Sequence, residues 1–131
     1  MMASMSPSFW LALGLAGSLG TMARFGVSYW MLQWFGRDFP WGTLLVNILG
    51  SFLMGFLAVY LLSKLHWPEP MRIVLLTGFL GAFTTFSAFS VDALFLIERE
   101  EWLRAIFYVM ASVLLALLAT RGGMLLAERM L

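Results

Sequence analysis

Charged residues divide the chain into long apolar runs. Uncharged stretches cover residues 1–23, 39–63, 73–91 and 105–120. A helix that crosses a bilayer needs about 20 mainly apolar residues, with a range of about 17–25. The pattern therefore predicts an all-α protein with four membrane-spanning helices.

The six tryptophans indicate where these helices end, because indole rings favour the headgroup level of a membrane. They lie near the edges of the apolar runs, at Trp10, Trp30, Trp34, Trp41, Trp67 and Trp102. The predicted helices cover about 9–34, 41–62, 71–97 and 102–126. The connections are short and carry Gly, Pro or charged residues, which is typical of turns. We expect one domain over residues 1–131, with no cleaved signal, because residues 1–23 lack a basic start.

The composition indicates a membrane protein, so the function is expected to lie in the bilayer. Hydrophobic residues make up 62% of the chain and charged residues only 11%. The net charge of +1 gives no basic field, so nucleic acid is not an expected partner. With no cysteine and a single histidine, His66, the chain has no candidate thiolate nucleophile or histidine metal cluster. An enzyme is not expected.

Lysine and arginine are evenly shared between the two predicted faces of the membrane. One face would hold Lys64, Arg72, Arg121 and Arg129, and the other Arg24, Arg37, Arg99 and Arg104. Because an excess of these residues normally sets orientation, an even share allows insertion both ways and an antiparallel homodimer. The alternative is that one residue near a boundary, such as Arg24, sets a single orientation.

Polar side chains recur on one face of the second predicted helix. Thr43, Asn47 and Ser51 are spaced by four residues, which places them on the same side of a helix. Asn47 lies near the centre of the span, where its amide must find partners or line a wet path. Hydrogen bonding between helices is the alternative explanation of such a stripe.

The third predicted helix carries Gly, Thr and Ser at mid-membrane depth, over residues 78–90. Glycines and adjacent threonines weaken a helix, and a break is tolerated in a membrane only where protein or a cavity covers it. Broken helices offer carbonyls to cations and amides to anions. The alternative is close helix packing through Gly78, Gly81 and Ala82. Phe83, Phe86 and Phe89 form either an apolar face or rings whose positive edges face an anion.

Other polar residues are fewer. Tyr108 and Ser112 share a face of the fourth predicted helix, either as a polar track or as hydroxyls bonded to their own backbone. Arg24 and Asp92 lie near helix ends, where they reach the interface or line a vestibule. No acidic residue lies at the middle of a span, which argues against a proton-coupled carrier.

Three segments resemble the signatures of the Fluc (CrcB) fluoride channels. They are GSLGTMARF (residues 17–25), GTLLVNILGSF (residues 42–52) and TGFLGAFTTFSAFS (residues 77–90). The resemblance implies a dual-topology, antiparallel homodimer with two pores in a bacterial inner membrane. It also implies passive export of cytoplasmic fluoride, with selectivity over chloride, which relieves fluoride toxicity.

The resemblance also assigns roles to residues of this chain. Asn47 would be the pore-lining amide, Phe86 and Phe89 the rings whose edges approach the ion, and Tyr108 and Ser112 a continuing polar track. Thr43 and Ser51 can supply further hydroxyl donors. A structural sodium ion at the dimer centre would be held by the backbone carbonyls of Gly81 and Thr84. The chain departs from the family pattern at Ala82, where a second glycine is often seen, and at Ala116, where some relatives carry a third hydroxyl.

Two other functions fit part of the pattern. A small dual-topology multidrug exporter has a similar length, but it would need a glutamate in the first helix, and residues 9–34 contain none. A non-transporting membrane assembly protein would use the glycines and phenylalanines for packing alone. Fluoride flux separates this alternative from a channel.

Overall fold

The computed structural model describes residues 5–131, and these form helices joined by short connections. In chain order the elements are α1 (Pro7–Phe35), α2 (Trp41–Ser63), α3 (Glu69–Ile73), the π-helix η2 (Val74–Leu80), α4 (Gly81–Phe83), α5 (Phe86–Glu98) and α6 (Trp102–Arg129). The described chain has the four helices that the sequence predicts, because the third predicted helix corresponds to α3, η2, α4 and α5 together. We call these four consecutive elements the third rod. The all-α fold class is confirmed, and the predicted ends differ by a few residues.

The first helix has clear start and stop signals. The Ser6 hydroxyl accepts a hydrogen bond from the Phe9 backbone N–H at 3.3 Å, and Pro7 occupies the first helical position. The helix ends at Gly36, whose φ of 79° is accessible to glycine at little cost. The chain then turns through residues 36–40 into α2.

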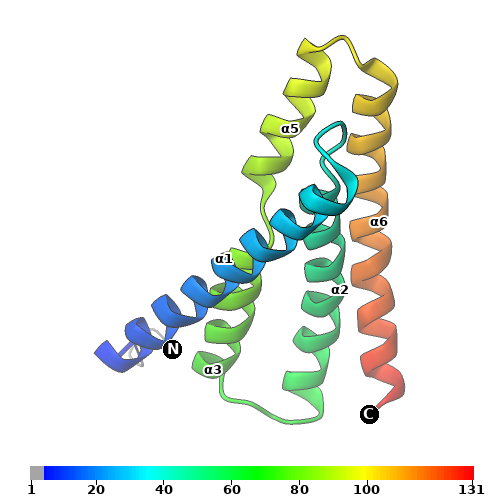
Figure 1. Cartoon of the computed structure of the whole chain (residues 1–131). Coiled ribbons are helices and arrows are strands. Elements are labelled where there is room, and N and C mark those ends of the chain that lie inside the picture. Colours follow the sequence, from blue (N-terminus) through cyan, green and yellow to red (C-terminus); the bar gives the residue numbers. More distant parts are fainter. Residues whose placement is uncertain (1–4) are drawn as a thin grey trace.

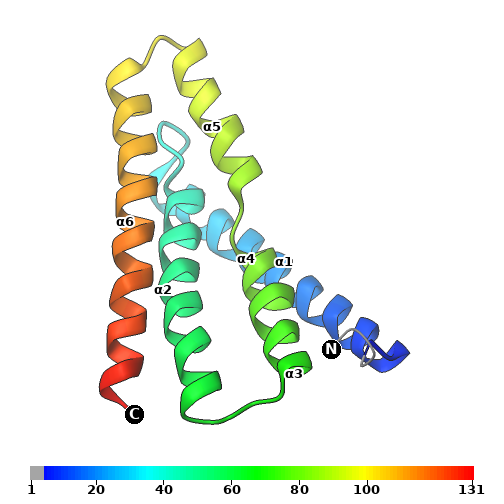
Figure 2. The ribbon, with the colours of Figure 1, turned by 180° about the vertical axis from the view of Figure 1, so that it is seen from behind.

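Two helices, α2 and α6, lie side by side and almost parallel to each other along their length (Figures 1 and 2). Glycine makes this close approach possible on both helices. A Cβ atom on Gly55 would overlap the carbonyl of Thr120, and one on Gly123 would overlap the carbonyl of Phe52. The backbones of α2 and α6 are therefore nearly in contact, as is common for small residues between membrane helices.

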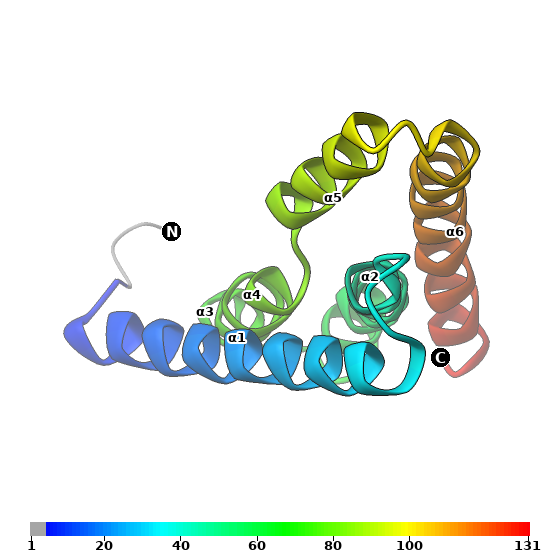
Figure 3. The ribbon, with the colours of Figure 1, turned by 45° about the horizontal axis from the view of Figure 1, so that its top comes forward.

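The first helix crosses the others obliquely and packs on η2 and α4 (Figure 3). A helix of 29 residues is about 44 Å long, more than the apolar thickness of about 30 Å of a bilayer. Gly20 marks the contact, because a Cβ there would overlap the carbonyl of Phe79. Gly20 therefore lets the backbone of α1 approach that of η2 closely.

Three helices of the described chain are long and apolar enough to cross a membrane: Trp41–Ser63, Glu69–Glu98 and Trp102–Arg129. Within the chain, only 28%, 17% and 17% of an apolar 18-residue stretch of these helices is buried, so most of their apolar surface faces outward. Such exposure suits a bilayer or a second chain rather than water. That α1 also spans the membrane stays a prediction, since it is not among these three.

The third rod is broken where the sequence predicts it. Thr84 and Thr85 have extended backbones, with φ and ψ of −90° and 157° and of −152° and 116°. The Thr85 hydroxyl then accepts from the Ala88 N–H at 3.2 Å and starts α5. The π-helical turn over Val74–Leu80, just before the break, was not predicted from the sequence.

Candidate functional site

The break in the third rod forms one wall of a groove, which we call the central groove. It has a volume of about 400 Å³, and its other walls come from α2, α5 and α6. Five of the seven predicted pore residues line it: Asn47, Ser51, Phe86, Phe89 and Ser112. The helix face of Asn47 and the residues around the break thus meet in space.

Asn47 is bonded to the break itself. Its side-chain oxygen accepts a hydrogen bond from the Thr85 N–H at 2.8 Å, and its amide nitrogen donates to the Thr85 carbonyl at 3.0 Å. Both backbone groups that the break exposes at Thr85 are thereby satisfied. Hydrogen bonding between segments, the alternative explanation of the polar stripe, is therefore present at Asn47.

The same bonds leave Asn47 with donor capacity. A carboxamide nitrogen carries two N–H groups, and one of them is used on Thr85. Because Asn47 lines the central groove, its second N–H is available to a group in that groove. Asn47 therefore combines a structural role with a fixed, uncharged donor.

Ser112 is a buried hydroxyl without a partner among the described residues. Its residue is 7% exposed, and Oγ makes no hydrogen bond there. Most buried polar groups are bonded, so an exception in a groove indicates a missing partner. The alternative prediction, in which the Ser112 hydroxyl bonds its own helix backbone, does not hold. Thr120, one turn beyond Ala116, does bond its own helix: its hydroxyl donates to the Ala116 carbonyl at 2.9 Å.

Two phenylalanines form the apolar part of the groove wall. The Phe86 and Phe89 ring centroids are 5.3 Å apart, with the rings tilted by 41°. Phe86 is 78% exposed in the single chain, whereas Phe89 packs on Tyr108 with centroids 5.4 Å apart. An exposed ring beside polar donors is the arrangement expected if these rings line a path rather than a core.

Tyr108, Thr43 and Asp92 lie beyond the central groove. Tyr108 is fully buried, and its hydroxyl donates to the Asp92 carboxylate at 3.1 Å. Thr43 and Asp92 line a second groove of about 230 Å³ below the α1–α2 loop, which we call the end groove. Tyr108 therefore lies between the two grooves, and its hydroxyl is not bonded to its own helix.

Arg24 contacts the break rather than either groove. Its Nε donates to the Ala82 carbonyl at 2.9 Å, across 58 positions of sequence. The guanidinium thus stabilises carbonyl groups at the C-terminal end of α4. The structure does not bring Arg24 and Asp92 together, and the vestibule role of both stays a prediction.

The predicted sodium ligands can be tested against the hydrogen bonds at the break. In a continuous helix the Gly81 carbonyl would accept from the Thr85 N–H, and the Thr84 carbonyl from the Ala88 N–H. Here the Thr85 N–H bonds Asn47 and the Ala88 N–H bonds the Thr85 hydroxyl. Both carbonyls have lost their helical donors, and Gly81 is exposed. The two oxygens are therefore without their helical donors, as cation ligands need to be, and the sodium site itself stays a prediction.

Some residues of the groove were not predicted. Thr85 supplies both backbone partners of Asn47, and Gly50 and Thr120 line the groove beside it. A Cβ on Gly50 would overlap the Thr84 methyl group, so this glycine lets the break approach α2. A threonine just before an apolar helical run is a helix N-cap signal, which could have singled out Thr85.

Comparison with known proteins gives one consistent result. Residues 11–124 match the profile of the family described as "CrcB-like protein, Camphor Resistance (CrcB)". The chain is 48% identical over 120 residues to the fluoride-specific ion channel FluC of Rhizobium meliloti, covering 92% of this chain and 96% of that protein. It is 42% identical over 119 residues to FluC of Hahella chejuensis, covering 91% and 94%.

A third relative is longer. The fluoride-specific ion channel FluC of Methylococcus capsulatus is 47% identical over 119 residues, which cover 91% of this chain and 52% of that protein. The chain therefore spans about half the length of this relative. These relatives are named as ion channels, in agreement with the expectation that the chain is not an enzyme.

Proposed function

The chain belongs to the CrcB family, and from that premise we propose that it is a fluoride-selective channel that passively exports cytoplasmic fluoride and so relieves its toxicity. The main structural support for this proposal is the central groove. Its wall combines Asn47, Ser51 and Ser112 with two phenylalanine rings, and none of its lining side chains is charged. Such a wall offers donors to an anion without a fixed positive charge that would hold it.

Fluoride is small and strongly hydrated, so a pore must replace its water with donors. The free N–H of Asn47 and the unpartnered hydroxyl of Ser112 can each donate to an anion in the central groove. Because the donors are neutral and several, binding is weak at each site and the ion can leave. Selectivity over chloride would follow from donor geometry and the size of the path.

The phenylalanines would form the narrow part of the path. The edges of the Phe86 and Phe89 rings carry partial positive charge and would face the ion, while their apolar surface would exclude most water. Tyr108 and Thr43 would continue the path toward the end groove, where Asp92 lies. Arg24 would favour anions near the break through its charge.

The working unit would be an antiparallel homodimer with two pores. Phe86 is 78% exposed in the single chain although it lines the groove, so a second copy would supply part of the missing wall. The equal share of Lys and Arg between the two faces supports insertion in both orientations. Protease would then remove an N-terminal tag from about half of the chains when added to only one side of sealed vesicles. Cleavage of nearly all or none would contradict dual topology.

A structural sodium ion would lie at the centre of this dimer. The carbonyls of Gly81 and Thr84, freed from helical bonding by the break, would hold it, and a second copy would double the number of oxygens. The ion would supply positive potential near both anion paths. We place the protein in a bacterial inner membrane as a multi-pass protein.

Fluoride release from liposomes tests this function. Purified protein is reconstituted into vesicles loaded with fluoride or with chloride, and release is followed with ion-selective electrodes after addition of a potassium ionophore. Fluoride release that requires the ionophore, without chloride release, is the expected result. No fluoride release from vesicles that contain folded protein would favour a non-transporting assembly protein.

A further inference from the structure

A third hollow lies outside the core, where the α1–α2 loop meets the start of α6. It has a volume of about 460 Å³ and is lined by four aromatic side chains, Leu103, Asp38 and Arg104. We call it the loop groove. It shares no lining residue with the central groove, and it borders the end groove, with which it shares Asp38, Phe39 and Trp41.

The four aromatic rings of the loop groove form a continuous row. Centroid distances are 5.9 Å from Phe35 to Trp41, 4.6 Å from Trp41 to Phe39 and 5.7 Å from Phe39 to Phe107. Phe39 is buried, but Phe35, Trp41 and Phe107 are 60%, 40% and 56% exposed. Exposed faces of Trp and Phe attract organic cations, above all alkylammonium groups.

One group of each charge borders these rings. Arg104 donates from one Nη atom to the Asp38 carbonyl and to the Glu101 carboxylate, both at 3.4 Å. A guanidinium has five N–H donors, and the Arg104 side chain is 52% exposed, so donors remain for a phosphate. Asp38 is an exposed residue that lines the same groove and brings a negative charge to it. A positive and a negative group around aromatic rings complement a zwitterion.

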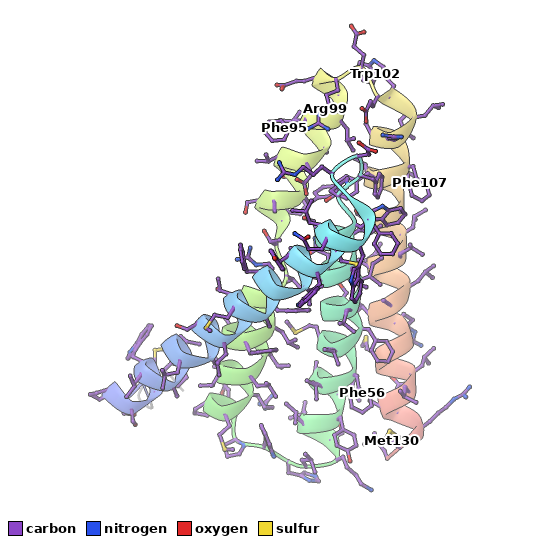
Figure 4. The ribbon with its side chains drawn as sticks, in the orientation of Figure 1. Phe56, Phe95, Arg99, Trp102, Phe107 and Met130 are labelled. Atoms are coloured by element: carbon purple, nitrogen blue, oxygen red, sulfur yellow. The ribbon has the colours of Figure 1, made fainter. Side chains whose placement is uncertain are left out.

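The position of the loop groove suits a lipid headgroup. Trp41 and Trp102 mark the headgroup level here, and Phe107 lies on α6 below Trp102, beside the α1–α2 loop (Figure 4). Leu103, Phe107, Met110 and Leu114 continue along one face of α6 and are 85%, 56%, 52% and 50% exposed. This apolar face leads from the groove into the depth of the membrane, where an acyl chain would lie.

We propose that the loop groove binds the headgroup of a zwitterionic phospholipid. Arg104 binds the phosphate, the ammonium group lies over the aromatic row beside Asp38, and an acyl chain follows the exposed face of α6. Ethanolamine and choline lipids share this chemistry. The site does not depend on fluoride conduction, so its test needs no flux measurement.

Native mass spectrometry of the purified protein in detergent tests the site. Dioleoyl phosphatidylethanolamine, phosphatidylcholine and phosphatidylglycerol are titrated separately, and bound lipids per chain are counted. We expect one of the two zwitterionic lipids to bind about twofold to fivefold more tightly than phosphatidylglycerol, the range of an exposed cation–π contact. Comparing the affinities of phosphatidylethanolamine and phosphatidylcholine shows whether the site prefers a primary or a quaternary ammonium group. Equal binding of all three, as in a groove covered by a second copy, or tighter binding of phosphatidylglycerol would overturn the proposal.

Variants assign the binding to the loop groove. Trp41→Leu removes the ring but keeps apolar surface, and should abolish the preference for zwitterionic lipid. Arg104→Gln should weaken all three lipids, because each carries a phosphate. Arg99→Gln is the matched control, since Arg99 is exposed at the same end but lines the end groove. If Arg104→Gln does not fold, Trp41→Leu alone tests whether the lipid binds in the loop groove. Binding by Trp41→Leu with an unchanged preference would overturn the assignment.

Discussion

The Asn47 side chain pairs with Thr85 in the way that two β-strands pair, through one accepted and one donated hydrogen bond of 2.8 and 3.0 Å. The pair ties α2 to the point where the third rod stops being helical. It also fixes the Asn47 amide so that one N–H remains for the central groove. Stability of the break and a proposed anion donor therefore depend on one side chain.

Asn47→Asp tests this double role. The aspartate keeps an acceptor for the Thr85 N–H but faces the Thr85 carbonyl with an oxygen instead of a donor. We expect a loss of about 1–3 kcal/mol in the free energy of unfolding, the cost of an unsatisfied buried polar group. Fluoride release should fall by about tenfold or more, equivalent to about 1.4 kcal/mol in a barrier.

Denaturant unfolding in detergent and liposome release measure the two effects. Gln33→Glu is the matched control, because it makes the same chemical change at an exposed position of α1. Undiminished fluoride release by Asn47→Asp would contradict the donor role.

Phe86→Ile and Phe89→Ile test the rings. Each keeps an apolar side chain but removes the aromatic edge, so fluoride release should fall by about tenfold while the protein elutes as the wild type does on gel filtration. Phe25→Ile, at a ring that is 71% exposed on α1 and lines neither groove, should release fluoride normally. Wild-type release by both variants would remove the rings from the path.

Ser112→Ala separates function from stability. Because the Ser112 hydroxyl has no partner among the described residues, its removal should leave the free energy of unfolding unchanged or raise it by about 1 kcal/mol. Fluoride release should nevertheless decrease, since a donor is lost from the groove. Thr120→Val is the comparison, because that hydroxyl is already bonded to its own helix. Destabilisation of Ser112→Ala without any change in release would show that the hydroxyl is structural.

The contact between α2 and α6 makes a prediction that concerns stability alone. Gly123→Ala places a methyl group against the Phe52 carbonyl and should cost about 1–3 kcal/mol, as overpacking does. Gly122→Ala is the matched control, because a Cβ there would have no atom of another helix within 4 Å. Thermal unfolding in detergent compares the two. Equal midpoints would contradict the close approach of the two backbones.

The sequence predicted the helices well because membrane spans depend on a single property, the length of an apolar run. It also predicted the break, since Gly81, Thr84 and Thr85 all disfavour a helix. The π-helical turn over Val74–Leu80 was missed, because the residues of that turn are ordinary apolar helix formers with one threonine and one glycine.

The site was predicted less completely than the fold. Asn47, Ser51 and Ser112 were found from helical spacing, which reports a shared face but not the partner across it. The partner of Asn47 is the backbone of Thr85. Nearly every residue has the same backbone groups, so the sequence does not indicate which of them bonds Asn47. The hydrogen bond from Tyr108 to Asp92 joins α6 to α5. The spacing of polar residues along each helix does not give the rotation of one helix relative to the other.

A thiol label placed in the central groove shows directly whether fluoride passes through it. The chain contains no cysteine, so Ser51→Cys introduces a single thiol into the groove wall, and Leu118→Cys introduces one on the exposed surface of α6. Both are treated with methyl methanethiosulfonate, labelling is verified by mass spectrometry, and fluoride release from liposomes is measured. Labelling should stop release by Ser51→Cys, because the label would block the central groove, and should leave release by Leu118→Cys unchanged. Undiminished release by fully labelled Ser51→Cys would show that fluoride does not pass through this groove.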